Sequence, residues 1–138
     1  MKSSTITVKV TISADEIKVW DYYTAPEHIT QWNFANDDWC CPSANNELSV
    51  GGKCIARMEA KDGSVGFDFE AVYDEVSVGE KLKYTMSDGR QATIVFKQLN
   101  DAVEVKVIFD ADNEPSLDMQ QAGWQAILNN FKKYVEAH

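Results

Sequence analysis

The segment LDMQQAGWQAILNNFKKYVEA, residues 117–137, carries the strongest structural signal in the chain. Large and mostly apolar side chains recur in it at three- and four-residue steps, the spacing of one face of an α-helix: Leu117, Gln121, Trp124, Ile127, Leu128, Phe131, Tyr134 and Val135. The pattern begins near Pro115 and predicts an amphipathic helix of about twenty residues, roughly 30 Å long. A helix of this length needs one continuous apolar surface to cover its buried face.

The chain before this helix supplies that surface as a series of strands. Polar and apolar residues alternate in the first segment, TITVKVTI (5–12), and in further segments around residues 54–58, 67–73, 82–86, 92–96 and 103–109. Turn signals such as Asp62-Gly63 and Asp88-Gly89 separate them, and turns this short make neighbouring strands antiparallel. Alternation gives each strand one buried face. Six or seven such strands with a single long helix to cover them must curl around that helix.

Two short helices are expected directly after the first strand. Ser13 stands three residues before Glu16, and Thr24 stands three residues before Glu27, which are capping-box patterns. Pro26 falls in the first turn of the second helix, where its missing N–H costs nothing. The sequence therefore predicts an α+β fold in one domain, residues 1–138, with two short helices that end near Trp32.

Composition and charge restrict the possible partners. The chain has 138 residues, of which 44% are hydrophobic and 25% charged, and a formal net charge of −9. This charge repels polyanions, so we expect neither nucleic acid nor a membrane surface as partner. We find no signal-peptide pattern and no apolar run of membrane-spanning length, so a cytoplasmic protein is expected. The odd number of cysteines, Cys40, Cys41 and Cys54, favours reduced thiols.

One segment fits neither a buried element nor an ordinary loop. ITQWNFANDDWCC (29–41) mixes three large aromatic residues with Asn and Asp. We interpret it as a loop over the mouth of an internal cavity, with the aromatic side chains shielding the opening and Asn36, Asp37 and Asp38 facing water. Gly123, inside the terminal helix, indicates either tight packing against the sheet or room for a ligand.

The order of these elements resembles the helix-grip fold of the START and polyketide-cyclase superfamily, also called SRPBCC or birch-pollen-allergen-like. Within it, five segments are similar to proteins related to the C-terminal domain of the activator of the heat-shock-protein-90 ATPase: PEHITQWNF (26–34), VGGK (50–53), MEAKDG (58–63), LKYTM (82–86) and GWQAILNNFKKYVE (123–136). Their order and spacing cover nearly the whole chain.

The resemblance implies a deep, mostly apolar cavity that holds a hydrophobic molecule. Carried over by position, its lining is Trp32, Phe34, Met58, Phe67, Phe69, Tyr84, Met86, Phe96, Met119, Gly123 and Ile127, with Trp39 and Cys40 in the lid. Aromatic and thioether side chains suit such a role, and Tyr84 adds a polar group that could orient a ligand. The alternative for each single residue is ordinary core packing.

Patterns for catalysis or metal binding are weak. His28 and His138 are expected on the surface, and adjacent Cys40 and Cys41 lack the spacing of zinc ligands. Asp68 and Glu70 alternate with two phenylalanines, so they should face solvent when the aromatic rings face inward. We therefore expect no catalytic residue, no metal and no cofactor.

Three functions stay open at this point. The favoured one is binding of a small hydrophobic or amphipathic molecule, by a monomer or a homodimer. The alternative is a module that interacts with a chaperone and stimulates its ATPase. The third is an enzyme of the cyclase or hydratase type with Tyr84 or Tyr73 as proton donor, although neither tyrosine has a visible partner. One scaffold carries many functions, so the fold cannot choose among them.

Overall fold

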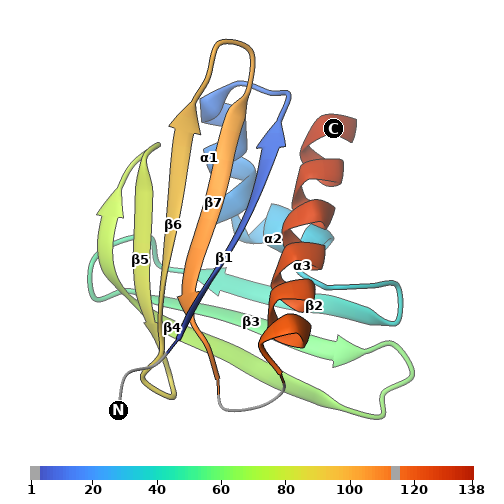
Figure 1. Ribbon diagram of the computed structural model, residues 1–138. Coiled ribbons are helices and arrows are strands. Elements are labelled where there is room, and N and C mark those ends of the chain that lie inside the picture. Colours follow the sequence, from blue (N-terminus) through green and yellow to red (C-terminus); the bar gives the residue numbers. More distant parts are fainter. Residues whose placement is uncertain (1–3, 113–115) are drawn as a thin grey trace.

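The computed structural model describes residues 4–112 and 116–138 (Figure 1). Its elements, in chain order, are β1 (Thr5–Ile12), α1 (Glu16–Thr24), α2 (Pro26–Trp32), β2 (Trp39–Asn46), β3 (Lys53–Ala60), β4 (Gly66–Ser77), β5 (Lys81–Met86), β6 (Gln91–Gln98), β7 (Val103–Asp110) and α3 (Leu117–Ala137). The strands form one antiparallel sheet in the order β1-β7-β6-β5-β4-β3-β2. The α+β helix-grip fold is confirmed.

The sheet is curled, as predicted, and shifts in strand register help to curl it. The pairing of β4 with β5 shifts between Tyr73 and Glu75, and that of β2 with β3 shifts between Cys40 and Ser43. An extra residue in one strand bends that strand and increases its twist. In Figure 1, β1, β6 and β7 lie roughly along the axis of α3, with β7 running opposite to it, whereas β2 and β3 cross that axis.

Both short helices are present, but their caps differ from the prediction. The α1 cap is Asp15, whose carboxylate accepts from the backbone N–H groups of Ile17 and Lys18 at 2.9 and 3.1 Å. The α2 cap is Ala25, without a side-chain hydrogen bond, and Pro26 opens the helix as expected. The capping boxes predicted at Ser13 and Thr24 were therefore wrong. Helix α1 begins two residues later than the Ser13 pattern suggests, and the Thr24 hydroxyl donates instead to the Trp20 carbonyl at 2.8 Å.

Strand β2 is the element that the sequence pattern missed. Its residues WCCPSANN do not alternate cleanly, and Pro42, Asn45 and Asn46 are poor strand formers. An edge strand tolerates them because one side of its backbone has no strand partner to bond. Trp39 and Cys40 therefore belong to the start of an edge strand and not to a loop, and the loop after α2 covers only residues 33–38.

Helix α3 begins at the Ser116 cap, whose hydroxyl accepts from the Met119 N–H at 3.2 Å, and Pro115 lies outside the described residues. Its apolar face buries Leu128, Phe131 and Val135 against the concave face of the sheet. The Trp124 ring stacks on Phe109 of β7, with ring centroids 4.0 Å apart. Within the described residues, no helix combines the length and the apolar character needed to cross a bilayer.

A second set of contacts holds α3 along β1, the edge strand of the sheet. Gln121 and Gln125 donate to the backbone carbonyls of Thr7 and Lys9 at 3.5 and 3.0 Å. Further along both elements, Lys132 donates to the Thr11 carbonyl, and the Glu136 carboxylate accepts from the Ser13 N–H at 2.9 Å. The helix therefore satisfies edge groups that would otherwise be open to another chain.

Gly123 lies in α3 without a packing reason. A Cβ placed there would meet no atom within 4 Å outside its own helical turn, which excludes tight packing as the explanation. Gly123→Ala should stabilise the protein by about 1 kcal/mol, since alanine is the better helix former and nothing obstructs its methyl group. Urea unfolding followed by circular dichroism measures the change.

Gly52→Ala is the matched control for this prediction. A Cβ at Gly52 would lie 2.2 Å from the Glu47 carbonyl oxygen, so this variant should lose stability by at least about 1 kcal/mol. Equal effects of the two substitutions would contradict the open space at Gly123.

Candidate functional site

A cavity of about 290 Å³ lies between α3, the two short helices and the concave face of the sheet. Most of its wall is aromatic or aliphatic. The described lining residues are Tyr23, Ile29, Trp32, Asn33, Cys54, Ala56, Met58, Phe67, Phe69, Tyr73, Leu82, Tyr84, Arg90, Val107, Trp124, Ile127 and Leu128. Small side chains on β3 leave the space: Ala56 stands opposite Phe69 in the strand register, and one helix alone cannot fill the hollow of the sheet.

The predicted lining agrees with this wall in part. Six predicted residues line the cavity: Trp32, Met58, Phe67, Phe69, Tyr84 and Ile127. The other five do not belong to its described lining: Phe34, Met86, Phe96, Met119 and Gly123. Phe96 instead packs edge-on against Trp20 and Tyr23, and Met119 is 65% exposed in the first turn of α3. A ligand-binding role stays a prediction for all eleven residues.

The segment expected to shield the opening, residues 29–41, includes buried, half-buried and exposed side chains. Trp32 is buried and its indole N–H donates to the Tyr22 carbonyl at 2.9 Å, so it belongs to the core. Trp39 is half-buried and packs edge-on against Phe67, at a centroid distance of 6.2 Å. Asn36, Asp37 and Asp38 are exposed, as predicted. A lid role for Trp39 and Cys40 remains a prediction.

Three tyrosines and one thiol bring polar atoms to this apolar wall. Tyr73 and Tyr84 are register partners on β4 and β5, with ring centroids 6.2 Å apart, and Tyr23 reaches the cavity from α1. The Tyr73 hydroxyl donates to the Asn46 side-chain oxygen at 2.7 Å and lies beside the Cys54 thiol. Burial is the main cause that raises the pKa of each of the four groups, so all are neutral at pH 7.

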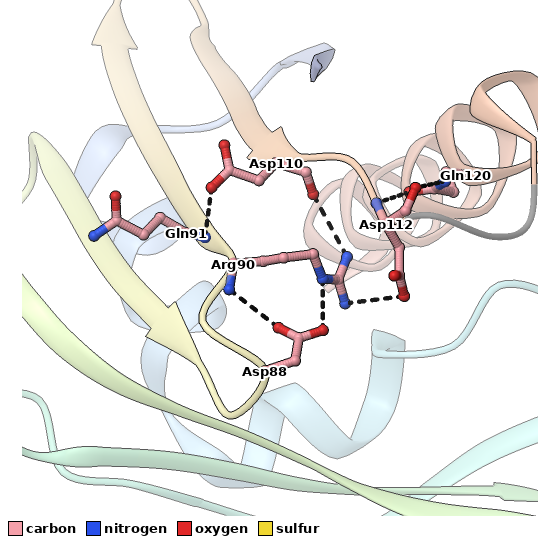
Figure 2. Close-up of polar contacts among 6 residues, drawn as sticks. All are labelled: Asp88, Arg90, Gln91, Asp110, Asp112 and Gln120. Atoms are coloured by element: carbon pink, nitrogen blue, oxygen red, sulfur yellow. Dashed lines mark hydrogen bonds and ion pairs between the residues drawn. The ribbon is translucent and has the colours of Figure 1, made fainter. Parts of the chain in front are cut away.

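Arg90 is the one charged side chain among the described lining residues, and Figure 2 shows how it is held. Its Nε contacts the Asp88 carboxylate at 2.7 Å, and the two terminal nitrogens lie 3.5 Å from the Asp110 carbonyl and 3.9 Å from the Asp112 carboxylate. Burial opposes ionisation of Asp88, but hydrogen bonds from Arg90 lower its pKa below the ordinary value. The guanidinium thus ties the β5–β6 turn to the end of β7.

Residues 13–136 match the family model described as Activator of Hsp90 ATPase homolog 1-like protein. The chain belongs to the AHSA1-like family. The solution structure of the AHSA1-like protein from Aeromonas hydrophila is 38% identical, with a TM-score of 0.91 over 97% of this chain and 93% of that one.

Two further structures extend the comparison. A Cytophaga hutchinsonii protein is 44% identical, with a TM-score of 0.84 over 96% of this chain and 92% of that one. A Nitrosomonas europaea protein is 15% identical, with a TM-score of 0.83 over 96% and 94% of the two chains, and shows the fold alone. A search of curated proteins finds no match. The family model and the two structures above 30% identity confirm the family and superfamily that the sequence resembles.

For this AHSA1-like chain, sequence reasoning missed most of the polar lining. Trp124 lies on the predicted face of the terminal helix, and Cys54, Ala56 and Tyr73 lie in the predicted alternating segments 54–58 and 67–73, so their periodicity could have identified them. Arg90 carried no such signal, because it follows the Asp88-Gly89 turn.

His28 was expected to be solvated, but it is half-buried. Its ring stacks on that of Tyr22, with centroids 3.9 Å apart, and its Nδ1 forms a hydrogen bond with the Tyr134 hydroxyl at 2.7 Å.

Cys54 offers a chemical test of the site in this AHSA1-like protein. At pH 8 its alkylation by iodoacetamide should be at least about tenfold slower than in the urea-unfolded chain, because a raised pKa and burial both lower the thiolate that reacts. Since the folded pKa is raised, the rate should keep increasing at pH values where an ordinary thiol has levelled off. Peptide mass spectrometry measures the rate for each cysteine.

Half-buried Cys40 serves as the internal control for solvent access in the same sample. Equal alkylation rates of Cys54 in the folded and the unfolded protein would contradict its placement in the cavity wall.

Proposed function

We propose that this one-domain protein binds a small hydrophobic or amphipathic molecule in the cavity between α3 and the sheet, without cofactor or covalent chemistry, in the cytoplasm. The single observation that carries the proposal is the space between helix and sheet: about 290 Å³ with a wall that is mostly aromatic and aliphatic. Small-molecule sites are concave, largely apolar and supplied with a few polar groups, and their volumes begin near 300 Å³. The ligand should therefore be small.

The character of the lining supports binding over acid–base catalysis. The described lining residues include neither a carboxylate nor an imidazole, which are the usual groups that move protons in a reaction. Tyr73 and Tyr84, the proton donors of the cyclase hypothesis, have raised pKa values because they are buried, which makes them weaker acids. Asp68 and Glu70 are exposed on the other face of β4, as expected.

Filling the cavity should abolish binding while leaving the fold intact. Ala56 is 2% exposed and faces the empty volume, so Ala56→Phe should raise the Kd for the neutral apolar dye N-phenyl-1-naphthylamine at least about tenfold. The free energy of unfolding should change by less than about 1 kcal/mol, because the new ring enters space and not packed atoms. Fluorescence titration and urea unfolding measure the two quantities.

Ala122→Phe, on the exposed face of α3, is the matched control and should leave the Kd unchanged. Destabilisation by more than about 2 kcal/mol in Ala56→Phe would point to a filled interior. Unaltered dye binding in that variant would place the dye elsewhere and remove the support for a cavity ligand.

The family description favours one second candidate, a module that interacts with a chaperone and raises its ATPase rate. Binding would then use exposed surface and not the cavity. When added in about tenfold molar excess over the purified chaperone, wild type and Ala56→Phe should stimulate its ATP turnover equally. No stimulation by either protein would end this candidate, whereas cavity binding would be untouched.

A further inference from the structure

Two hydroxyl groups in the cavity wall have no hydrogen-bond partner among the described residues. Tyr84 is 8% exposed, yet its hydroxyl takes part in no hydrogen bond, and the same is true of Tyr23. Every fully enclosed side-chain nitrogen or oxygen in the described part of the chain has a partner. These two hydroxyls are therefore not sealed inside the packing; they retain accessible surface, and both residues line the cavity.

The unpartnered hydroxyls converge from different elements on one region. Tyr84 on β5 stands opposite Tyr73 on β4, whose own proton is committed to Asn46 at 2.7 Å. Tyr23 is fixed from α1 by edge-on contacts with Phe96 and Phe131, at centroid distances of 5.5 and 5.1 Å. Leaving a buried hydroxyl unpaired is unfavourable, so a polar atom that entered here would be held.

The charge around this region decides which kind of polar atom fits. The phenols and the Cys54 thiol are neutral at pH 7, so they can donate to an oxygen without supplying a counter-charge. Arg90, the charged lining residue, is already bonded to Asp88 and the Asp110 carbonyl and faces Asp112. A buried carboxylate or phosphate would lose its hydration without gaining an uncommitted cation.

From these contacts we propose that the ligand carries an uncharged hydrogen-bond acceptor, such as a carbonyl or ether oxygen, which receives a hydrogen bond from the Tyr84 hydroxyl. This inference rests on the proposed cavity function and specifies its ligand class. The apolar body of the ligand extends from Cys54 toward Met58 on β3, a span of about 13 Å for four strand residues. Met58 pairs with Phe67, which is 51% exposed and marks the end nearest solvent.

Three naphthalene probes of similar size separate the contributions: 2-ethylnaphthalene, 2-acetylnaphthalene and 2-naphthoate. Isothermal titration calorimetry of the wild type should give a Kd for the ketone about five- to tenfold below that of the hydrocarbon, with the carboxylate weakest. In Tyr84→Phe the ketone should lose this advantage, while the Kd of the hydrocarbon stays within twofold. Tyr22→Phe, a half-buried tyrosine outside the cavity, should keep the wild-type pattern.

The three probes also distinguish the possible failures. Equal affinities of the ketone and the hydrocarbon in the wild type, or tightest binding of 2-naphthoate, would overturn the ligand class while leaving cavity binding in place. No binding of any probe would overturn the cavity function and this inference together. The comparison within the wild type needs no variant, so it holds even where Tyr84→Phe folds poorly, which circular dichroism checks.

Discussion

Helix α3 lies along the edge of β1, and this contact sets both the burial of the helix and the shape of the interior. Four residues of a helix advance about 6 Å, and two residues of a strand advance about 6.6 Å, so a helix and a strand that run in the same direction can stay in step. Gln121 and Gln125 therefore meet the carbonyls of Thr7 and Lys9 in succession, and Glu136 still reaches the Ser13 N–H at the far end. The same placement buries Phe131 and Val135 under the sheet.

This placement also explains why the interior is hollow. A helix fixed to one edge covers the nearby strands β1 and β7, as the stacking of Trp124 on Phe109 shows, but the curled sheet continues to β4, β3 and β2 beyond it. On that far side the inward positions of β3 carry small side chains, Cys54 and Ala56, and α1 and α2 close the end. While α3 keeps its hydrogen bonds to the β1 edge, it cannot also pack against β3 and β4, and the volume left between them is the cavity.

The polar groups in the cavity wall restrict the possible ligands more than the shape of the cavity does. Arg90 is engaged by backbone and carboxylate oxygens that tie the β5–β6 turn to the end of β7, which is a structural role (Figure 2). Tyr73 is engaged by Asn46 across β4 and β2. Tyr84 and Tyr23 lack such partners in the described chain, which distinguishes them from polar groups that only stabilise the fold. Membership of the AHSA1-like family fixes the scaffold, whereas these side chains set what it could hold.

Periodicity in the sequence predicted an antiparallel sheet curled around one long helix, because strict alternation in β1 and β7 and the three- and four-residue steps of α3 each leave only one buried face, and the family resemblance added the helix-grip topology. Periodicity also determined that Asp68 and Glu70 face water. Long-range contacts place Pro42 and Asn45 in an edge strand, leave Met119 exposed and bring Arg90 to the cavity wall. These depend on which edge α3 covers and where β4 bends, and contacts between residues so far apart in the chain leave no periodic signal in it.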